Sequence, residues 1–193
     1  MAKNYPTGYR VPHYNVLLIS CIDLRLTDNI VQFMDHDNLT NRYDHFILAG
    51  TSIGIFVADL DEAELVLIPE YGVWLDTLKH HIDLAIQLHE VKDFYIMEHR
   101  NCGAYKSFLK DHKGDFDEME DGFNAEYRSH LKYAVKLRDV ILEYVEESGA
   151  KIAASDNRDV NKHAIKYNGK FNIHSFLMDI KGNVELLDTT KED

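Results

Sequence analysis

The chain has 193 residues, of which 45% are hydrophobic, and this length and composition suit one substantial core, so we expect a single domain over residues 1–193. The formal net charge of −12 at pH 7 argues against a nucleic-acid partner, because a binding surface would have to form against the protein's own field. The opening residues lack the apolar core of a secretory signal, and no apolar run approaches the roughly 20 residues that span a bilayer. We therefore expect a cytoplasmic protein without a membrane partner.

The first part of the sequence is predicted to form a strand, a helix, a second strand and a loop. Residues 16–20 are a continuous apolar run rich in branched side chains, which is typical of a strand covered on both faces. Thr27 and Asp28 can cap a helix, and apolar side chains then recur at helical spacing. Residues 46–48 predict a second strand, which leads into residues 49–54, a loop whose glycines allow close approach of the backbone to a ligand or another segment.

The middle of the sequence adds a long helix and a third strand. Pro69 precedes a helical pattern whose apolar stripe ends near residues 91–92. Residues 94–97 predict the third strand, and we expect a further helix to begin near Gly103.

The last part of the sequence predicts another long helix and a closing hairpin. The helix covers residues 124–147 by its apolar period, and we expect Ser148 and Gly149 to end it. Residues 156–167 form a weaker helix or a loop, and residues 172–187 read as a hairpin that closes the sheet around Gly182 and Asn183. Strands that alternate with helices predict an α/β fold in which helices flank a central, mostly parallel sheet.

Two short polar motifs follow predicted strands and contain the only cysteines of the chain. Cys21-Ile22-Asp23-Leu24-Arg25 follows the first strand, and His99-Arg100-Asn101-Cys102-Gly103 follows the third. Together they offer two thiols, an imidazole and a carboxylate, which is a full set of candidate ligands for one tetrahedral zinc ion. In a reducing compartment such a cysteine pair indicates a metal site or a reversible dithiol rather than a structural disulfide, and two buried apolar thiols remain the simplest alternative.

The two motifs are expected to meet in space. In parallel sheets of this kind ligands collect at the carboxyl ends of the strands, near the point where the strand order switches. Both cysteine motifs and the loop that begins at Ala49 and Gly50 follow strands and so fall at that edge. Asp23 and Arg25 would lie there as well, either as working groups or as a structural ion pair.

These residues resemble a known family. The pattern Cys-x-Asp-x-Arg after strand one and His-x-x-Cys-Gly after strand three is similar, in order and separation, to the zinc motifs of the β-carbonic anhydrases. The resemblance extends to Ala49 and Gly50, to the helix that leads through residues 88–92 into strand three, and to the closing hairpin at residues 173–183. It therefore covers most of the chain.

The resemblance implies a function and a role for each matching residue. Cys21, His99 and Cys102 would bind Zn²⁺, with water or the carboxylate of Asp23 in the fourth place, and Asp23 and Arg25 would form the catalytic dyad. The implied reaction is the reversible hydration of carbon dioxide to bicarbonate and a proton, for which zinc makes hydroxide available near neutral pH. The resemblance also implies a homodimer or a higher homo-oligomer.

Four residues, at three sites, depart from the pattern of the family. Leu24 replaces a serine, Glu98 replaces the glycine before the histidine, and residues 47–48 replace an Arg-Asn pair. A Glu98 carboxylate that faced the zinc would make the site more negative and oppose bicarbonate, whereas one that points away would not. Two alternatives stay open: hydrolysis of another small heterocumulene such as carbon disulfide or carbonyl sulfide, and a non-catalytic zinc-stabilised protein that binds an anion or a partner.

Other polar groups of the sequence are predicted to lie in solvent. The acidic stretch over residues 110–122 lacks the spacing of a calcium loop and is expected to be a solvated loop. The same expectation, exposure without a partner, holds for most of the histidines outside the motifs: His80, His81, His89, His112, His130 and His163.

Overall fold

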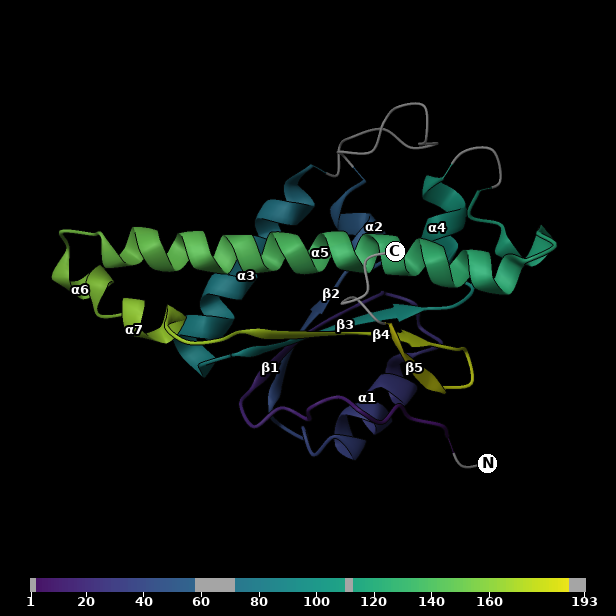
Figure 1. Ribbon diagram of the computed structural model, residues 1–193, viewed down its shortest axis with the longest axis horizontal. Coiled ribbons are helices and arrows are strands. Elements are labelled where there is room, and N and C mark those ends of the chain that lie inside the picture. Colours follow the sequence, from purple (N-terminus) through teal and green to yellow (C-terminus); the bar gives the residue numbers. More distant parts are fainter. Residues whose placement is uncertain (1–2, 58–71, 110–112, 188–193) are drawn as a thin grey trace.

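Five strands form one sheet in the order β2-β1-β3-β4-β5 (Figure 1). In the computed structural model, which describes residues 3–57, 72–109 and 113–187, β1 (Val16–Ser20) pairs in parallel with β2 (Tyr43–Ile47) and with β3 (Asp93–His99). On the other side of β3, β4 (Asn172–Met178) is also parallel, and β5 (Val184–Leu187) closes the sheet antiparallel to β4. The mostly parallel sheet of a single α/β domain is thus confirmed.

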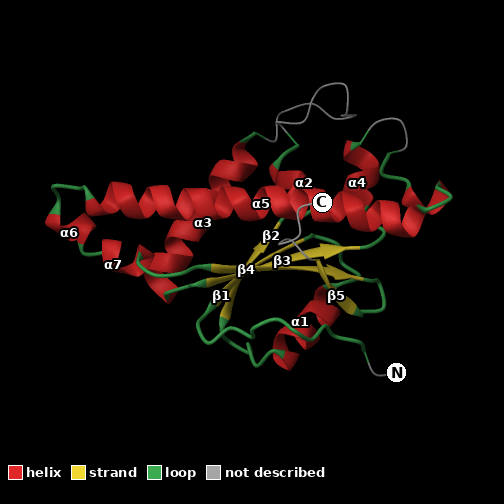
Figure 2. Ribbon diagram, in the orientation of Figure 1, coloured by secondary structure: helices red, strands yellow, loops and turns green. Residues whose placement is uncertain are grey.

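Helices cover both faces of this sheet, as Figure 2 shows. Helix α1 (Thr27–His36) packs on one face, and α3 (Val73–His89) and α5 (Gly122–Ala153) lie on the other. Shorter helices complete the set: α2 (Ser52–Ile55), α4 (Gly103–Phe108), the 3₁₀ helix Phe116–Glu118, α6 (Arg158–Asn161) and α7 (Ala164–Tyr167).

The two apolar layers follow from alternation along the central strands. Val16 and Leu18 face α1 and pack with Phe33, whereas Leu17 and Ile19 face the layer of α3 and α5. Every residue of β1 and β3 is buried, because both strands are central and covered on both faces. This is why the apolar run at residues 16–20 does not alternate with polar side chains.

The structure corrects the predicted end of the long helix. Ser148 and Gly149 do not end α5, which continues to Ala153. A Cβ atom at position 149 would lie 2.9 Å from Cβ of Tyr167, so the glycine makes room for α7 instead of stopping the helix.

The start of α1 and the loop after β2 also differ in detail from expectation. Leu26 is the residue that caps α1, without a side-chain hydrogen bond, and its side chain is buried against the helix, so burial rather than a Thr27 or Asp28 cap fixes this end. Residues 52–55 of the predicted loop form the helical turn α2.

Pro69, His112 and residues 110–111 of the acidic stretch lie outside the described residues. Within the described part of the chain, no helix combines the length and apolar character needed to cross a membrane.

Candidate metal centre

The two cysteine motifs meet at the carboxyl edge of the two central strands. Cys21 follows β1, His99 is the last residue of β3, and Cys102 is the residue before α4. Because β1 and β3 are neighbours in register, with Ser20 opposite Met97, the residues that follow them come together. The structure thus brings the two motifs together at the edge where the strand pattern predicts them.

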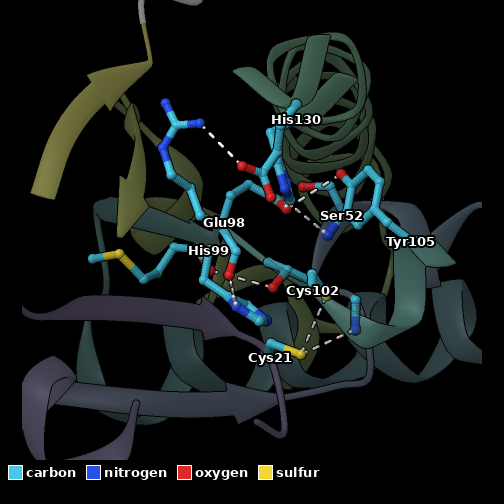
Figure 3. Close-up of polar contacts among 12 residues, drawn as sticks. Cys21, Ser52, Glu98, His99, Cys102, Tyr105 and His130 are labelled. Atoms are coloured by element: carbon cyan, nitrogen blue, oxygen red, sulfur yellow. Dashed lines mark hydrogen bonds and ion pairs between the residues drawn. The ribbon is translucent and has the colours of Figure 1, made fainter. Parts of the chain in front are cut away.

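Three ligand atoms form a tight, buried group at this edge (Figure 3). The Sγ atoms of Cys21 and Cys102 lie 4.0 Å apart, and the ligand atoms of both cysteines and His99 are all within 4.8 Å of one another. All three residues are buried, and both thiols are free of a disulfide. Among the residues that the structure describes, no fourth His, Cys, Asp or Glu belongs to this group.

The histidine is oriented as a metal ligand. Its Nδ1 lies 3.0 Å from the backbone carbonyl oxygen of Arg100, which can only accept, so Nδ1 carries a proton and, in the neutral imidazole, Nε2 carries the lone pair. That Nε2 atom is buried and has no hydrogen-bond partner in the structure. A buried acceptor without a partner costs free energy, and an ion between Nε2 and the two sulfur atoms would supply the missing interaction. The residues present therefore fit a zinc ion.

The contact between the two thiols shifts their pKa values in opposite directions. The hydrogen bond from Cys102 lowers the pKa of the Cys21 thiol, and the backbone N–H of Gly50 lowers it further. The same contact, together with burial, raises the pKa of Cys102. Gly50 N–H donates to the Cys21 sulfur at 3.3 Å, so the loop after β2 already stabilises a thiolate at this position.

Asp23 lines the same cavity as Cys21, and its carboxylate is bound by Arg25. The guanidinium donates in a fork, with Nε 2.9 Å from Oδ1 and one terminal nitrogen 2.6 Å from Oδ2, and the backbone N–H of Arg25 adds a third bond to Oδ1 at 3.0 Å. These contacts hold the pKa of Asp23 at about 2, with the Arg25 hydrogen bond as the largest cause. The same terminal nitrogen of Arg25 donates to the backbone oxygen of Asn101 at 3.0 Å, so the pair is tied to the second motif.

A cavity of about 390 Å³ opens beside this group. Aromatic and small apolar side chains form most of its wall, with the carboxylate of Asp23 at one side: the lining residues are Cys21, Ile22, Asp23, Ala49, Trp74, Gly103, Ala104, Ser107 and Phe108. Among these described lining residues there is no lysine, arginine or histidine. The cavity therefore suits a small, uncharged molecule.

Glu98 points away from the candidate ligands and is buried in a separate polar cluster. Its carboxylate accepts from the backbone N–H of Ser52 at 3.0 Å and from the Tyr105 hydroxyl at 3.3 Å, and lies 2.8 Å from Nδ1 of His130 (Figure 3). His130 is fully buried, so its predicted exposure is wrong. The signal was its spacing on α5, where it shares a face with the buried residues Tyr133 and Ala134.

Arg100 fixes the turn between His99 and Cys102. Its guanidinium donates to Glu126 on α5 at 3.0 Å and to Glu185 on β5 at 2.6 Å, and lies 3.6 Å from the ring centre of Phe123. The other Glu126 oxygen accepts from the backbone N–H of Asn101, which has a positive φ of 57°. These contacts of Arg100 and Asn101 could not be predicted from the sequence, because Glu126 and Glu185 lie far away along the chain.

Comparison with known sequences gives relatives without a described function. No family model matches the chain. An uncharacterized protein of Rickettsia conorii is 29% identical over 129 residues, which are 67% of this chain and 60% of that protein. An uncharacterized protein of Rickettsia bellii is 28% identical over 122 residues, covering 63% of this chain and 68% of its own. This chain thus spans about 60% of the length of the first of these relatives.

Comparison with solved structures finds β-carbonic anhydrases at low similarity. CafA of Aspergillus fumigatus is 14% identical, with 93% of this chain and 78% of that chain covered and a TM-score of 0.45. Wild-type CafD from the same fungus is 12% identical, with 92% and 91% covered and a TM-score of 0.46. A tetrameric β-carbonic anhydrase of Sordaria macrospora is 16% identical, with 94% and 83% covered and a TM-score of 0.41. At these values the chemistry of this chain has to be read from its own residues.

Proposed function

We propose that this protein is a zinc enzyme that catalyses the reversible hydration of carbon dioxide to bicarbonate and a proton. The observation that carries the proposal is the group of Cys21, His99 and Cys102, whose ligand atoms lie within 4.8 Å of one another next to an apolar cavity. Three protein ligands and an open fourth position are typical of catalytic rather than structural zinc sites.

The residues around the centre have different roles in this reaction. A bound zinc ion supplies hydroxide near neutral pH as the nucleophile. Asp23, which Arg25 keeps ionised and fixed in orientation, would accept a hydrogen bond from that hydroxide and orient its lone pair toward the carbon atom. The hydroxide keeps its proton in bicarbonate, and the proton that the reaction releases comes from the water that regenerates the hydroxide. The apolar wall, including Trp74 and Phe108, holds carbon dioxide and keeps other water away. Because Asp23 is held by Arg25, we assign it to the dyad and leave the fourth position to solvent.

The cavity supports a second substrate class. Bicarbonate is an anion, and the described lining residues of the cavity provide no cationic side chain to attract it. Arg25 lies nearby, but Asp23 neutralises its charge. A neutral heterocumulene such as carbon disulfide or carbonyl sulfide needs no cationic side chain to attract it, so its hydrolysis is the second candidate function. The non-catalytic alternative loses support, because Glu98 does not fill the cavity and Asp23 does not lie among the ligands.

The proposal includes assembly into a homodimer or a higher homo-oligomer, which the resemblance to the β-carbonic anhydrases implies. The side chains of Ile22 and Leu24 next to the dyad are 62% and 87% exposed in the single chain, and such apolar surface is compatible with burial against a second copy. Analytical ultracentrifugation of the purified protein measures the assembly directly.

The decisive experiment measures zinc and both activities on the same preparation. We expect about one zinc ion per chain by elemental analysis, and hydration of carbon dioxide in stopped-flow assays. Cys102→Ser should lose zinc and activity, whereas Ser148→Ala, a buried change away from the site, should keep both. A preparation made without chelator that holds no zinc refutes the metal centre. Zinc with carbon disulfide hydrolysis but without hydration of carbon dioxide selects the second candidate.

A further inference from the structure

The carboxylate of Glu98 joins three elements behind the candidate metal centre. It extends from β3 and contacts α2 through the Ser52 N–H, α4 through the Tyr105 hydroxyl, and α5 through His130. The side chain of Glu98 is 1% exposed, so these groups replace water for a carboxylate in the protein interior. A buried acidic side chain at such a junction fixes the relative positions of the elements that it contacts.

The loop that Glu98 contacts has an unfavourable backbone conformation. Thr51 has φ 49° and ψ −110°, and the N–H of Ile53 donates to the carbonyl of Gly50 at 3.2 Å, so Thr51 occupies the first central position of a tight turn. A turn with positive φ at this position strongly favours glycine, and a β-branched residue there is strained. Such strain persists only where the surroundings hold it.

Two contacts from β3 hold this turn. The Thr51 hydroxyl donates to the backbone oxygen of Met97 at 3.2 Å, and the Ser52 N–H donates to Oε1 of Glu98 at 3.0 Å. Without these contacts only the long bond from the Ile55 N–H to the Thr51 carbonyl oxygen, at 3.4 Å, restrains the peptide between Thr51 and Ser52, and rotation of that peptide can relieve the strain. The held turn in turn places Gly50, whose N–H donates to the Cys21 sulfur.

We infer that Glu98 is a positioning residue of the metal centre, which acts through the strained Thr51–Ser52 turn to fix the Gly50 N–H against the sulfur of Cys21. The carboxylate thereby links β3, which provides His99, to the ligand that follows β1. Its effect on metal binding rests on the proposed function, whereas its effect on the turn does not. Glu98 thus supports the site from behind and is not among the residues that line the cavity.

The test uses substitutions that remove each contact in turn. Glu98→Leu removes the acceptor of the Ser52 N–H, and Thr51→Val removes the hydroxyl while it keeps the strained β-branched shape. Glu98→Gln keeps an acceptor oxygen and serves as the matched control. Tyr144→Phe, which removes a hydrogen bond to Asp83 far from the site, controls for a general loss of stability.

Two measurements separate the turn from the metal. In metal-free protein, amide hydrogen exchange by NMR should show faster exchange at Gly50 in Glu98→Leu and in Thr51→Val, with wild-type exchange in Glu98→Gln and Tyr144→Phe. Zinc affinity, measured by competition with a chromophoric chelator, should fall by about tenfold to 100-fold in the first two variants, as for other residues that support ligands. Adding Thr51→Gly to Glu98→Leu should restore most of both values, because glycine adopts the turn without strain.

The outcomes are distinct. Wild-type exchange at Gly50 in folded Glu98→Leu overturns the inference, and so does a double variant that shows no recovery, because a general packing defect would not respond to glycine at position 51. If Glu98→Leu does not fold, Thr51→Val decides, and wild-type exchange in that variant overturns the inference. If wild-type protein binds no zinc, the proposed function fails while the exchange data still decide the role of Glu98.

Discussion

Replacing Gly50 by alanine gives the sharpest test of the packing around the candidate metal centre. Gly50 has φ 79°, and a Cβ atom there would lie 2.8 Å from both Cβ of Ala104 and Cγ2 of Ile53. The left-handed backbone costs a residue with a side chain about 1–2 kcal/mol, and forced overpacking costs about 1–3 kcal/mol. We therefore expect Gly50→Ala to reduce the free energy of unfolding by about 2–5 kcal/mol.

The assay is urea denaturation of metal-free protein, with Gly169→Ala as the control. Gly169 has a similar φ of 96°, but a Cβ atom at that position would meet no atom within 4 Å. The control therefore carries the backbone cost alone, about 1–2 kcal/mol, and the difference between the two variants isolates the clash with Ala104 and Ile53. Equal loss of stability in both variants would refute the close approach of the Gly50 loop to α4.

Three further predictions concern groups elsewhere in the site and the fold. Arg100→Met leaves the buried Glu126 carboxylate without its cation and should cost about 3–5 kcal/mol in urea denaturation, whereas Arg128→Gln, which breaks an exposed ion pair, should leave the transition near that of wild type. Burial, followed by a hydrogen bond to a carboxylate, raises the pKa of Tyr144 to about 12, which favours the neutral phenol in the folded state. This stabilisation is complete below about pH 10 and is lost as the pH rises towards 12, so Tyr144→Phe should show a shallower fall in stability in denaturation series over that range. Asp23→Asn should reduce carbon dioxide hydration by about 100-fold or more in stopped-flow assays while zinc content is unchanged, and wild-type rates would assign the carboxylate a structural role.

Much of the fold could be predicted because local patterns carry it. Residues 16–20 match β1, since a central parallel strand is apolar on both faces and needs no context to be recognised. The end of α5 could not be predicted, because Gly149 is a helix breaker by propensity and becomes acceptable only when Tyr167 packs on it. Tertiary contact therefore decided the one long element whose boundary was wrong.

In the candidate site, too, some residues could be predicted from the sequence and others could not. The proximity of Cys21, His99 and Cys102 could be predicted from the sequence, because strand ends in a parallel sheet share an edge. The partners of Glu98 could not, since Ser52 and His130 lie 46 and 32 residues away and the pairing depends on how α2 and α5 pack. Motifs thus predicted the candidate ligands, and only the structure revealed the residues that support these ligands from the far side of β3.

The meeting of the two sulfur atoms has a consequence for the stability of the whole chain. Cys21 and Cys102 lie 81 residues apart in sequence and 4.0 Å apart in space. An ion bound by both would be held by the folded chain and released on unfolding, so its binding free energy would add to the stability of the fold. Removal of the metal by a chelator should then lower the thermal midpoint even though the sheet remains intact. The same ligands would then serve both the chemistry at the strand ends and the stability of the whole chain.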